Sequence, residues 1–291
     1  LVCVGSGKIW MHCDNKGLPK LIPNAIGVSL DESRFNSIYV SNAMGVYFSI
    51  NGGVSWTGKN ESTLTAHRIN SFCIDESNRI RRIYTVTDGG IFYTESNNNW
   101  SNEQKWIDPN SNLLKKALIS CVLINEQKNV FLVGTAGQGI YFKNDFNNDW
   151  DSLDCNGKSN FFVTDIEPNS DFQNIFVGTK TNGIFKVHSN LTSCENIVDN
   201  FNAIVTDIET ISDFEDFIFF STYDSGIYKY DISSPQPEPG INLDDIQYYS
   251  LTSFKKNGLS YLLAGSSEGI CLLYTSPSPR DLSTSRMPSS A

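Results

Sequence analysis

The chain has 291 residues, of which 12% are aromatic and 19% charged, and its formal net charge is −10 at pH 7. This composition is typical of an ordered globular protein rather than a disordered one. The acidic balance disfavours nucleic acid and anionic membranes as partners, and no apolar run reaches the roughly 18 residues that would predict membrane insertion.

A repeat runs through the chain and decides the predicted fold. Related segments lie at 37–49, 82–94, 130–143, 175–187, 219–231 and 262–270, and the opening VCVGSGKIW belongs to the same set. The spacings between the recurrent glycines are 38, 45, 49, 44, 43 and 43 residues, for Gly7, Gly45, Gly90, Gly139, Gly183, Gly226 and Gly269. Such a period is typical of one propeller blade. We therefore predict an all-β protein, a β-propeller of four-stranded antiparallel blades, with about seven blades visible and the first and last incomplete.

Each repeat follows the same order along the chain. It begins with an alternating strand, such as INSFCID at 69–75, and continues through a polar turn into a second strand such as IYTVT. A short polar loop and the recurrent glycine lead into a third strand such as GIFYT, and an Asn/Gly-rich turn leads to a tryptophan before the fourth. This alternation favours antiparallel hairpins, and the glycine is expected to supply a positive φ or a close backbone approach.

The stretch SINGGVSW resembles an Asp-box, with Ser49, Asn51, Gly53 and Trp56 at its motif positions and Asn51 in place of the aspartate. In the predicted blade it falls in the turn between the third and fourth strands. The Asn side chain and the glycines are expected to organise that turn, and Trp56 is expected to pack between neighbouring blades. We therefore interpret the motif as a folding device rather than a sign of catalysis.

With this motif and its IYVGT-like blades, residues 1–270 resemble the Asp-box (BNR), sortilin-like and YVTN-type β-propeller superfamily. That group includes binding propellers and xyloglucanase propellers, and it is mostly extracytoplasmic. The resemblance implies an extracellular, periplasmic or cell-surface location. Fold alone does not fix function, so two hypotheses stay open. One is a non-catalytic exported binding module, and the other is a fragment of a glycoside hydrolase of the two-propeller xyloglucanase type.

The sequence singles out no catalytic or metal-ligating residue and implies no cofactor. A sialidase is disfavoured because its substrate clamp needs arginines from several blades, whereas the arginines before residue 271 end at Arg82. The histidines His12, His67 and His188 fall in three separate repeats, without carboxylates at metal-ligand spacing. A non-enzyme is therefore favoured.

The cysteines before residue 271 fall into two groups. Cys73 and Cys121 lie in apolar strand patterns and are expected to be buried thiols. The other four could form disulfides in an exported protein, but the sequence does not give their pairing: Cys3, Cys13, Cys155 and Cys194.

The loops between second and third strands share one end of each blade with the connections that lead into the first strands, and we call this the top end. We predict ligand contacts there for His67, Arg68, Asp88, Gln138, Lys180, Asn202, Tyr223 and Asp224. Their mixed donors and acceptors suit a protein, peptide or glycan partner, and a monomeric propeller is expected.

Residues 271–291 resemble translated sequencing-adapter sequence. CLLYTSPSPRD at Cys271–Asp281 and SRMPSSA at Ser285–Ala291 match two adapter segments in the right order. We therefore expect a propeller over 1–270, truncated at both ends, and a non-native, disordered tail over 271–291 that supplies no strand.

Overall fold

A computed structural model gives the conformation of most of the chain. It describes residues 2–4, 9–11, 16–20, 25–29, 37–58, 68–76, 81–96, 114, 117–199, 201–233, 237–239, 246–275 and 282–286. His12 and His67 lie outside the described residues. The regular elements within these ranges are β-strands, as the alternating patterns predict.

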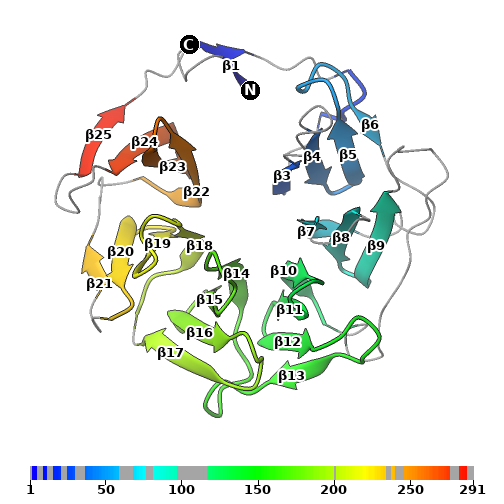
Figure 1. The fold of residues 1–291 in the computed structure, drawn as a ribbon, viewed down its shortest axis with the longest axis vertical. Helices are drawn as coiled ribbons and strands as arrows, with labels where there is room; N and C mark the ends of the chain where they lie inside the picture. Colours follow the sequence, from blue (N-terminus) through cyan, green and yellow to red (C-terminus); the bar gives the residue numbers. More distant parts are fainter. Residues whose placement is uncertain are drawn as a thin grey trace. The chain divides into compact units, whose positions relative to one another are not determined.

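The described strands form seven sheets, and in each the neighbours follow chain order (Figure 1). The first holds β1 (Val2–Val4) and β2 (Ile9–Met11). The second holds β3 (Ala25–Ser29), β4 (Ser37–Asn42), β5 (Gly45–Ser49) and β6 (Thr57–Gly58), and the third holds β7 (Ile69–Asp75), β8 (Arg81–Thr87) and β9 (Gly90–Ser96). The fourth holds β10 (Ile119–Asn125), β11 (Val130–Thr135), β12 (Ile140–Lys143) and β13 (Asp151–Leu153).

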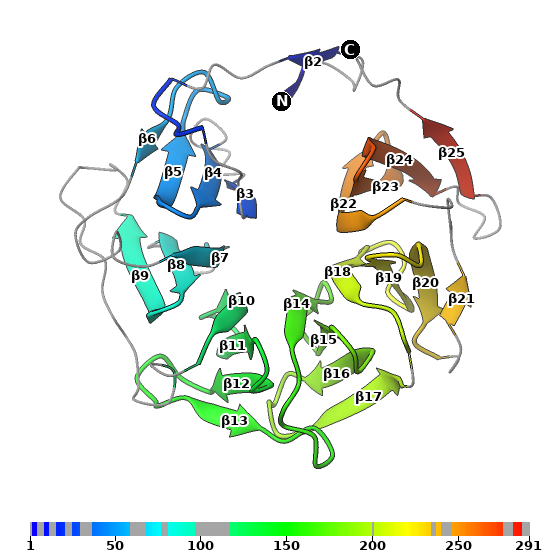
Figure 2. The same cartoon turned by 180° about the vertical axis from the view of Figure 1, so that it is seen from behind.

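The remaining three sheets have four strands each, and Figure 2 shows them from behind. The fifth holds β14 (Val163–Pro168), β15 (Asn174–Thr179), β16 (Ile184–His188) and β17 (Cys194–Val198). The sixth holds β18 (Val205–Thr210), β19 (Phe217–Thr222), β20 (Ile227–Asp231) and β21 (Pro237–Pro239). The seventh holds β22 (Tyr248–Lys256), β23 (Leu259–Ser266), β24 (Gly269–Thr275) and β25 (Leu282–Arg286). Their pairings are antiparallel, so the predicted four-stranded antiparallel sheets are confirmed.

The chain divides into two compact units. Unit 1 consists of Leu1–Leu132 and Lys143–Trp150, and unit 2 of Val133–Phe142 and Asp151–Ala291. Apolar side chains from neighbouring sheets meet inside each unit. In unit 1, Tyr39 and Phe48 pack with Phe72 of the next sheet. In unit 2, strands β15 and β19 supply Phe176 and Phe220 to one shared cluster.

A recurrent turn fixes the start of each third strand. The residue that ends the second strand donates its hydroxyl to the carbonyl of the recurrent glycine at 2.7–3.0 Å, in the pairs Thr87–Gly90, Thr135–Gly139, Thr179–Gly183, Thr222–Gly226 and Ser266–Gly269. Gly183 has a φ of +68°, and an added Cβ would lie 1.7 Å from the carbonyl oxygen of Val198. The glycine is needed for both reasons that its spacing predicted.

The stretch from Ser49 to Trp56 forms a turn closed by its own side chains. Ser49 Oγ accepts the amide of Gly53 at 2.9 Å, and Asn51 Oδ1 accepts the amide of Ser55 at 3.0 Å. The Trp56 indole donates to the carbonyl of Gly53 at 3.1 Å, and its ring packs against its own sheet in a cluster with Val40 and Tyr47. The sequence predicted that Trp56 packs between neighbouring blades, whereas its described cluster is formed by its own sheet and Leu18. The folding role of the motif stays a prediction, and its membership of the Asp-box family stays a resemblance.

The end of the chain differs from the expectation. Strand β24 continues to Thr275, and β25 pairs with it from Cys271↔Arg286 to Thr275↔Leu282. The last sheet therefore has four strands, where the sequence predicted an incomplete blade and a tail without a strand. Backbone ladder bonds need no particular side chain, so a polar segment can pair with an edge strand. The adapter origin of 271–291 and the total blade number stay predictions.

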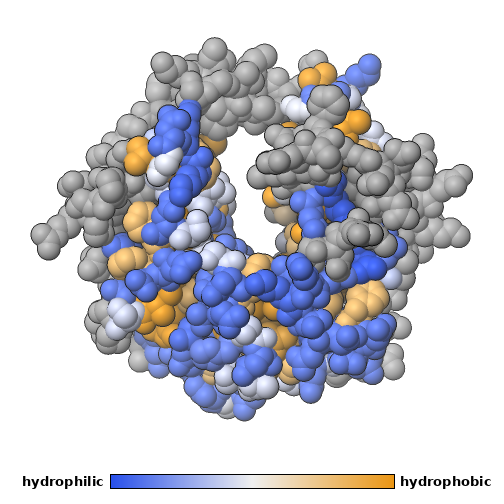
Figure 3. Space-filling model, in the orientation of Figure 1, coloured by the Kyte–Doolittle hydropathy of each residue, from blue (hydrophilic) through white to orange (hydrophobic). Residues whose placement is uncertain are grey.

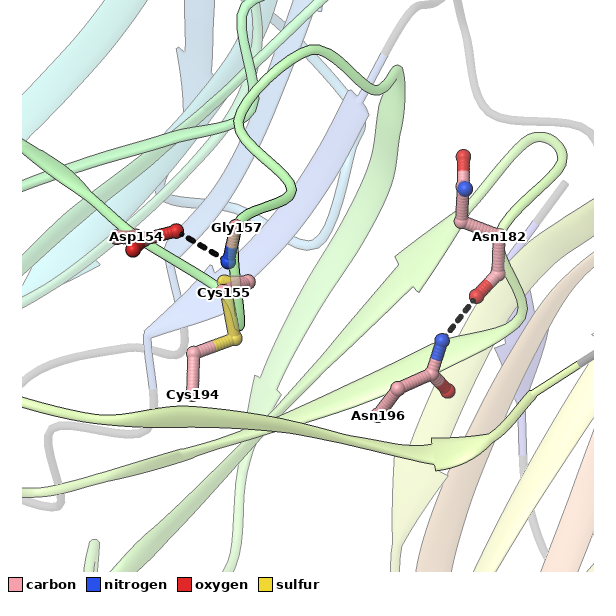
Figure 4. Close-up of a disulfide and its surroundings, with 6 residues drawn as sticks. All are labelled: Asp154, Cys155, Gly157, Asn182, Cys194 and Asn196. Atoms are coloured by element: carbon pink, nitrogen blue, oxygen red, sulfur yellow. Dashed lines mark hydrogen bonds between the residues drawn. A yellow bond between two sulfur atoms is a disulfide. The ribbon is translucent and has the colours of Figure 1, made fainter.

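A disulfide links two neighbouring sheets of unit 2 (Figure 4). Cys155 follows β13, Cys194 begins β17, and their Cα atoms are 4.6 Å apart. The turn that carries Cys155 is closed by the amide of Gly157, which donates to Asp154 Oδ1 at 2.8 Å. Cys73 and Cys121 are thiols outside any disulfide. Cys121 is buried, as its strand pattern predicted, whereas Cys73 is half-buried, and burial raises the pKa of Cys73.

We expect Trp56→Ala to lower the free energy of unfolding by about 3–5 kcal/mol, because it removes a large buried aromatic ring. Asn51→Ala is the control within the same turn and should cost about 1 kcal/mol, since only turn hydrogen bonds are lost. Denaturant unfolding measures both. Equal stabilities of Trp56→Ala and the wild type would contradict the assigned packing of this turn.

Removing the disulfide with the double variant Cys155→Ala and Cys194→Ala is expected to cost about 2–4 kcal/mol, because the bond closes a loop between residues 39 positions apart. The measurement is denaturant unfolding with and without a thiol reductant. Reductant should lower the wild-type midpoint and leave that of the double variant unchanged. A reductant effect of the same size on both proteins would show that the bond does not stabilise the fold.

Candidate functional site

Backbone hydrogen bonds build the top end of each sheet. The loop after the second strand donates to the residue just before or at the start of the first strand, as in Lys180 N to Phe162 O at 3.0 Å and Tyr223 N to Ile204 O at 3.0 Å. The same bond joins Ser267 N to the residue before β22 at 2.9 Å. The two sets of loops therefore lie together within each sheet, which is the arrangement that the repeat predicts.

In unit 1, the top-end residues Arg68 and Asp88 are brought together. The Asp88 carboxylate accepts the backbone amide of Arg68 at 3.1 Å, and the Asp88 amide donates to the Arg68 carbonyl at 3.2 Å. Both side chains are exposed. The Asp88 carboxylate thus holds its own loop, and the Arg68 guanidinium faces solvent. Their ligand contacts stay a prediction.

In unit 2, the predicted residues Gln138, Lys180, Asn202, Tyr223 and Asp224 are all exposed. The Gln138 amide oxygen accepts the Tyr141 hydroxyl at 3.3 Å, and the Lys180 ammonium lies 5.6 Å above the Phe162 ring. Asp224 accepts the Ser225 hydroxyl at 3.1 Å within its own turn. Tyr223 and Asp224 share one loop, and the other three residues lie on three further loops. Their ligand contacts stay a prediction.

Two exposed aromatic residues of this end were missed by the sequence reasoning. Tyr249 is 48% exposed, and its ring lies 6.2 Å from that of Tyr223, so the pair joins the sixth and seventh sheets. The Tyr249 hydroxyl donates to Gln247 Oε1 at 2.7 Å. Phe162 is 36% exposed and carries the Lys180 ammonium over its ring.

The missed signal is an aromatic doublet where the first strand begins. Phe161–Phe162 directly precedes β14, and Tyr248–Tyr249 begins β22 at the register shift between Tyr248 and Ser250. In both doublets the first ring is buried, at 4% and 1% exposure, and the second faces solvent. Adjacent side chains of an extended segment point to opposite faces, so two neighbouring aromatics predict one ring in the core and one outside it. Residues of this kind are rigid and amphipathic, which suits them to binding.

The two arginines of β8 form ion pairs with carboxylates of unit 1. Arg82 pairs with Glu95 at 2.7 Å and with Glu126, which also accepts the Tyr84 hydroxyl. Arg81 pairs with Glu76 at 2.6 Å. These two arginines therefore bind the protein's own carboxylates.

Lys143 is buried inside an aromatic cluster of unit 1. Its ammonium lies 5.0 Å from the Phe131 ring, 4.9 Å from Phe146 and 5.3 Å from Trp150, and it donates to the Phe146 carbonyl at 2.6 Å. Burial lowers the pKa of this amine, while nearby carboxylates such as Asp145 act in the opposite direction. These contacts hold the turn before β13, so we assign the cluster a structural role.

Three further observations concern the described residues as a whole. They contain no group of three or more His, Cys, Asp or Glu side chains placed to hold a metal ion. None of their segments forms a helix with the length and hydropathy of a membrane span. On the face drawn in Figure 3, hydrophilic residues predominate and hydrophobic ones are interspersed among them.

Comparison with known structures identifies the fold. The chain is similar to an ancestral GH74 enzyme, with a TM-score of 0.68 and 13% identity over 94% of this chain and 38% of that one. It is similar to the extracellular domain of BT4673 from B. thetaiotaomicron, with a TM-score of 0.68 and 18% identity over 95% of this chain and 35% of that one. The protein is a β-propeller. It spans little more than a third of these two proteins.

A third structure, YCF48 bound to D1 peptide, has a TM-score of 0.63 and 10% identity over 88% of this chain and 79% of that one. The propeller's sequence matches no family model, and no curated protein matches it. The comparisons therefore establish the fold, and the function has to be argued from the top-end residues.

Proposed function

We propose that this propeller is a non-catalytic, exported binding module that holds a polypeptide segment at the top end of unit 2. The observation that carries the proposal is the exposed aromatic pair Tyr223–Tyr249, together with the Phe162–Lys180 pair on the same end of another sheet. Tyrosine rings offer large apolar contact with few rotatable bonds, so they lose little entropy on binding. Their hydroxyls, together with the exposed Gln138 and Asn202 on other top-end loops, supply polar partners for a peptide backbone.

The net charge of the chain favours a polypeptide ligand rather than a polyanionic one. The chain is acidic overall, and the Lys180 ammonium at this end rests on an aromatic ring. A peptide needs a few hydrogen bonds and apolar anchors rather than a strong positive field. The likeness to YCF48 bound to D1 peptide also favours this class of ligand.

Two observations support the proposed extracytoplasmic location. The Cys155–Cys194 disulfide suits an oxidising compartment, because such bonds are rare in reducing ones. The likeness to the extracellular domain of BT4673 points the same way. We propose that the module acts as a monomer without a cofactor.

A second candidate is a part of a glycoside hydrolase, favoured by the likeness to the GH74 enzyme. Such catalysis needs two carboxyl groups across a substrate cleft. The two candidates are distinguished by measuring the affinity of the purified chain for xyloglucan oligosaccharides and for peptides, because a part of such a hydrolase should bind the glycan and the binding module should bind a peptide.

The binding proposal is tested by selecting a peptide ligand from a peptide array and measuring its Kd with variants. Tyr249→Ala and Tyr223→Ala should each weaken binding by about tenfold or more, as loss of an aromatic anchor does. Phe254→Ala is the matched control, because Phe254 is 40% exposed and lies on the same strand, near the end of β22 opposite to Tyr249. There its ring stacks on that of Tyr261. This variant should change the Kd by less than about twofold.

Two outcomes would contradict the proposal. An equal loss of affinity in Phe254→Ala and Tyr249→Ala would place the ligand elsewhere on the sheet. Binding to a glycan array together with no binding to peptides would replace the polypeptide ligand by a carbohydrate.

A further inference from the structure

The first strands β14 and β18 of unit 2 carry carboxyl groups at matching places. Each strand begins with a register shift, and the residue after it is Asp165 in β14 and Asp207 in β18. Two residues further on lie Glu167 and Glu209. In β22 the residue after the same shift is Ser250, so β22 does not continue the series there.

These carboxyl groups join one sheet to the next. Asp165 Oδ2 accepts the backbone amide of Ile208 at 2.9 Å, and Asp207 Oδ2 accepts that of Leu251 at 2.7 Å. Glu209 makes the same kind of bond to the backbone of β22 at 2.9 Å. Ile208 and Leu251 occupy matching places, each one residue after the register-shifted position of its strand. The same bond is therefore repeated from one sheet to the next.

The acids also lie against one another. Asp165 Oδ2 and Asp207 Oδ1 both accept the backbone amide of Ile208, at 2.9 and 3.0 Å, so the two carboxyl groups lie side by side, and a proton on one of them removes the repulsion of two like charges. Burial raises the pKa of all four groups, and the charges of neighbouring acids raise the pKa of Glu167, Asp207 and Glu209 further.

The described elements packed against these acids offer little opposing charge. Strands β15 and β19 contain no charged residue, and β22 contributes Lys255 and Lys256 at its far end. The Lys255 ammonium is bound to Asp213 at 2.7 Å. Unit 1 differs, because there the half-buried Arg82 pairs with Glu95 and Glu126.

We propose that Asp165, Glu167, Asp207 and Glu209 form a proton-dependent clasp between the fifth, sixth and seventh sheets, which holds them together in acid and loosens as the pH rises. Loss of the proton leaves adjacent carboxylates without a cation, and their repulsion weakens the bonds to β18 and β22. The folded state holds these protons more tightly than the unfolded chain does. The stabilisation is therefore complete below the ordinary carboxyl range near 4 and is lost as the pH rises through the raised pKa values.

Thermal unfolding of the whole chain between about pH 5 and about pH 8 tests the clasp. We expect the wild-type midpoint to fall by several degrees over this range. Asp207→Asn keeps the side-chain shape and an oxygen for the Leu251 amide but cannot ionise, so its fall should be roughly half that of the wild type or less. Asp213→Asn is the control, because Asp213 is exposed, is bound to Lys255 and has a lowered pKa. It should leave the pH-dependent fall intact.

Identical pH dependence in Asp207→Asn and the wild type would overturn the proposal. If Asp207→Asn does not fold, the infrared absorption of the folded wild type decides, since a protonated carboxyl group gives a C=O band distinct from that of a carboxylate. A protonated band that persists at neutral pH and disappears before unfolding at higher pH supports the clasp. Its absence at neutral pH refutes it. Peptide binding is not involved in either measurement, so this test stands apart from that of the proposed function.

Discussion

The structure depends on the need to cover both faces of its second strands. In β15 and β19 every residue after the first is buried, and in β11 the whole strand is buried. A strand in this state needs an apolar partner on each side, and a single four-stranded sheet supplies none. Neighbouring sheets meet this need in unit 2, where Phe176 of β15 and Phe220 of β19 belong to one cluster.

This constraint determines which strands can carry carboxyl groups and exposed aromatic side chains. Where the second strands are covered in this way, partly exposed side chains lie on the first and third strands and at the loops. The first strands β14 and β18 show the same alternation of one buried and two half-buried residues. The carboxyl groups occupy the half-buried positions, and the exposed aromatics occupy the strand starts. Covering the hydrophobic strands therefore concentrates both features on the same few strands.

The sequence predicted the fold because its signals are local and repeated. The recurrent glycine is required by a positive φ and a close carbonyl at Gly183, so its spacing gives the blade period directly. The turn from Ser49 to Trp56 is held by bonds among residues at most four apart, and it too could be predicted from the motif. Strand β25 could not be predicted, because its backbone hydrogen bonds to the exposed edge of β24 require no particular side chains.

The site was predicted less completely, since its contacts join residues far apart in the chain. The pairing of Cys155 with Cys194 depends on how two sheets pack, and six cysteines allow many pairings. Tyr249 and Phe162 could have been found, because adjacent aromatics in an extended segment point to opposite faces, so one ring of each doublet is expected to face outward. The contact between Tyr223 and Tyr249 could not be predicted, as it crosses from one sheet to the next.

The two proposals concern the same strand, and its geometry explains how they are related. The amide that Asp207 binds belongs to Leu251, two residues after Tyr249 on β22. Tyr223 follows β19, whose sheet also contains Asp207. The bond between Asp207 and Leu251 therefore crosses the same junction as the Tyr223–Tyr249 contact. A loosened clasp would change the spacing of the two rings before it exposed the apolar core, because the Tyr223–Tyr249 pair lies at the sheet ends, where fewer contacts hold it.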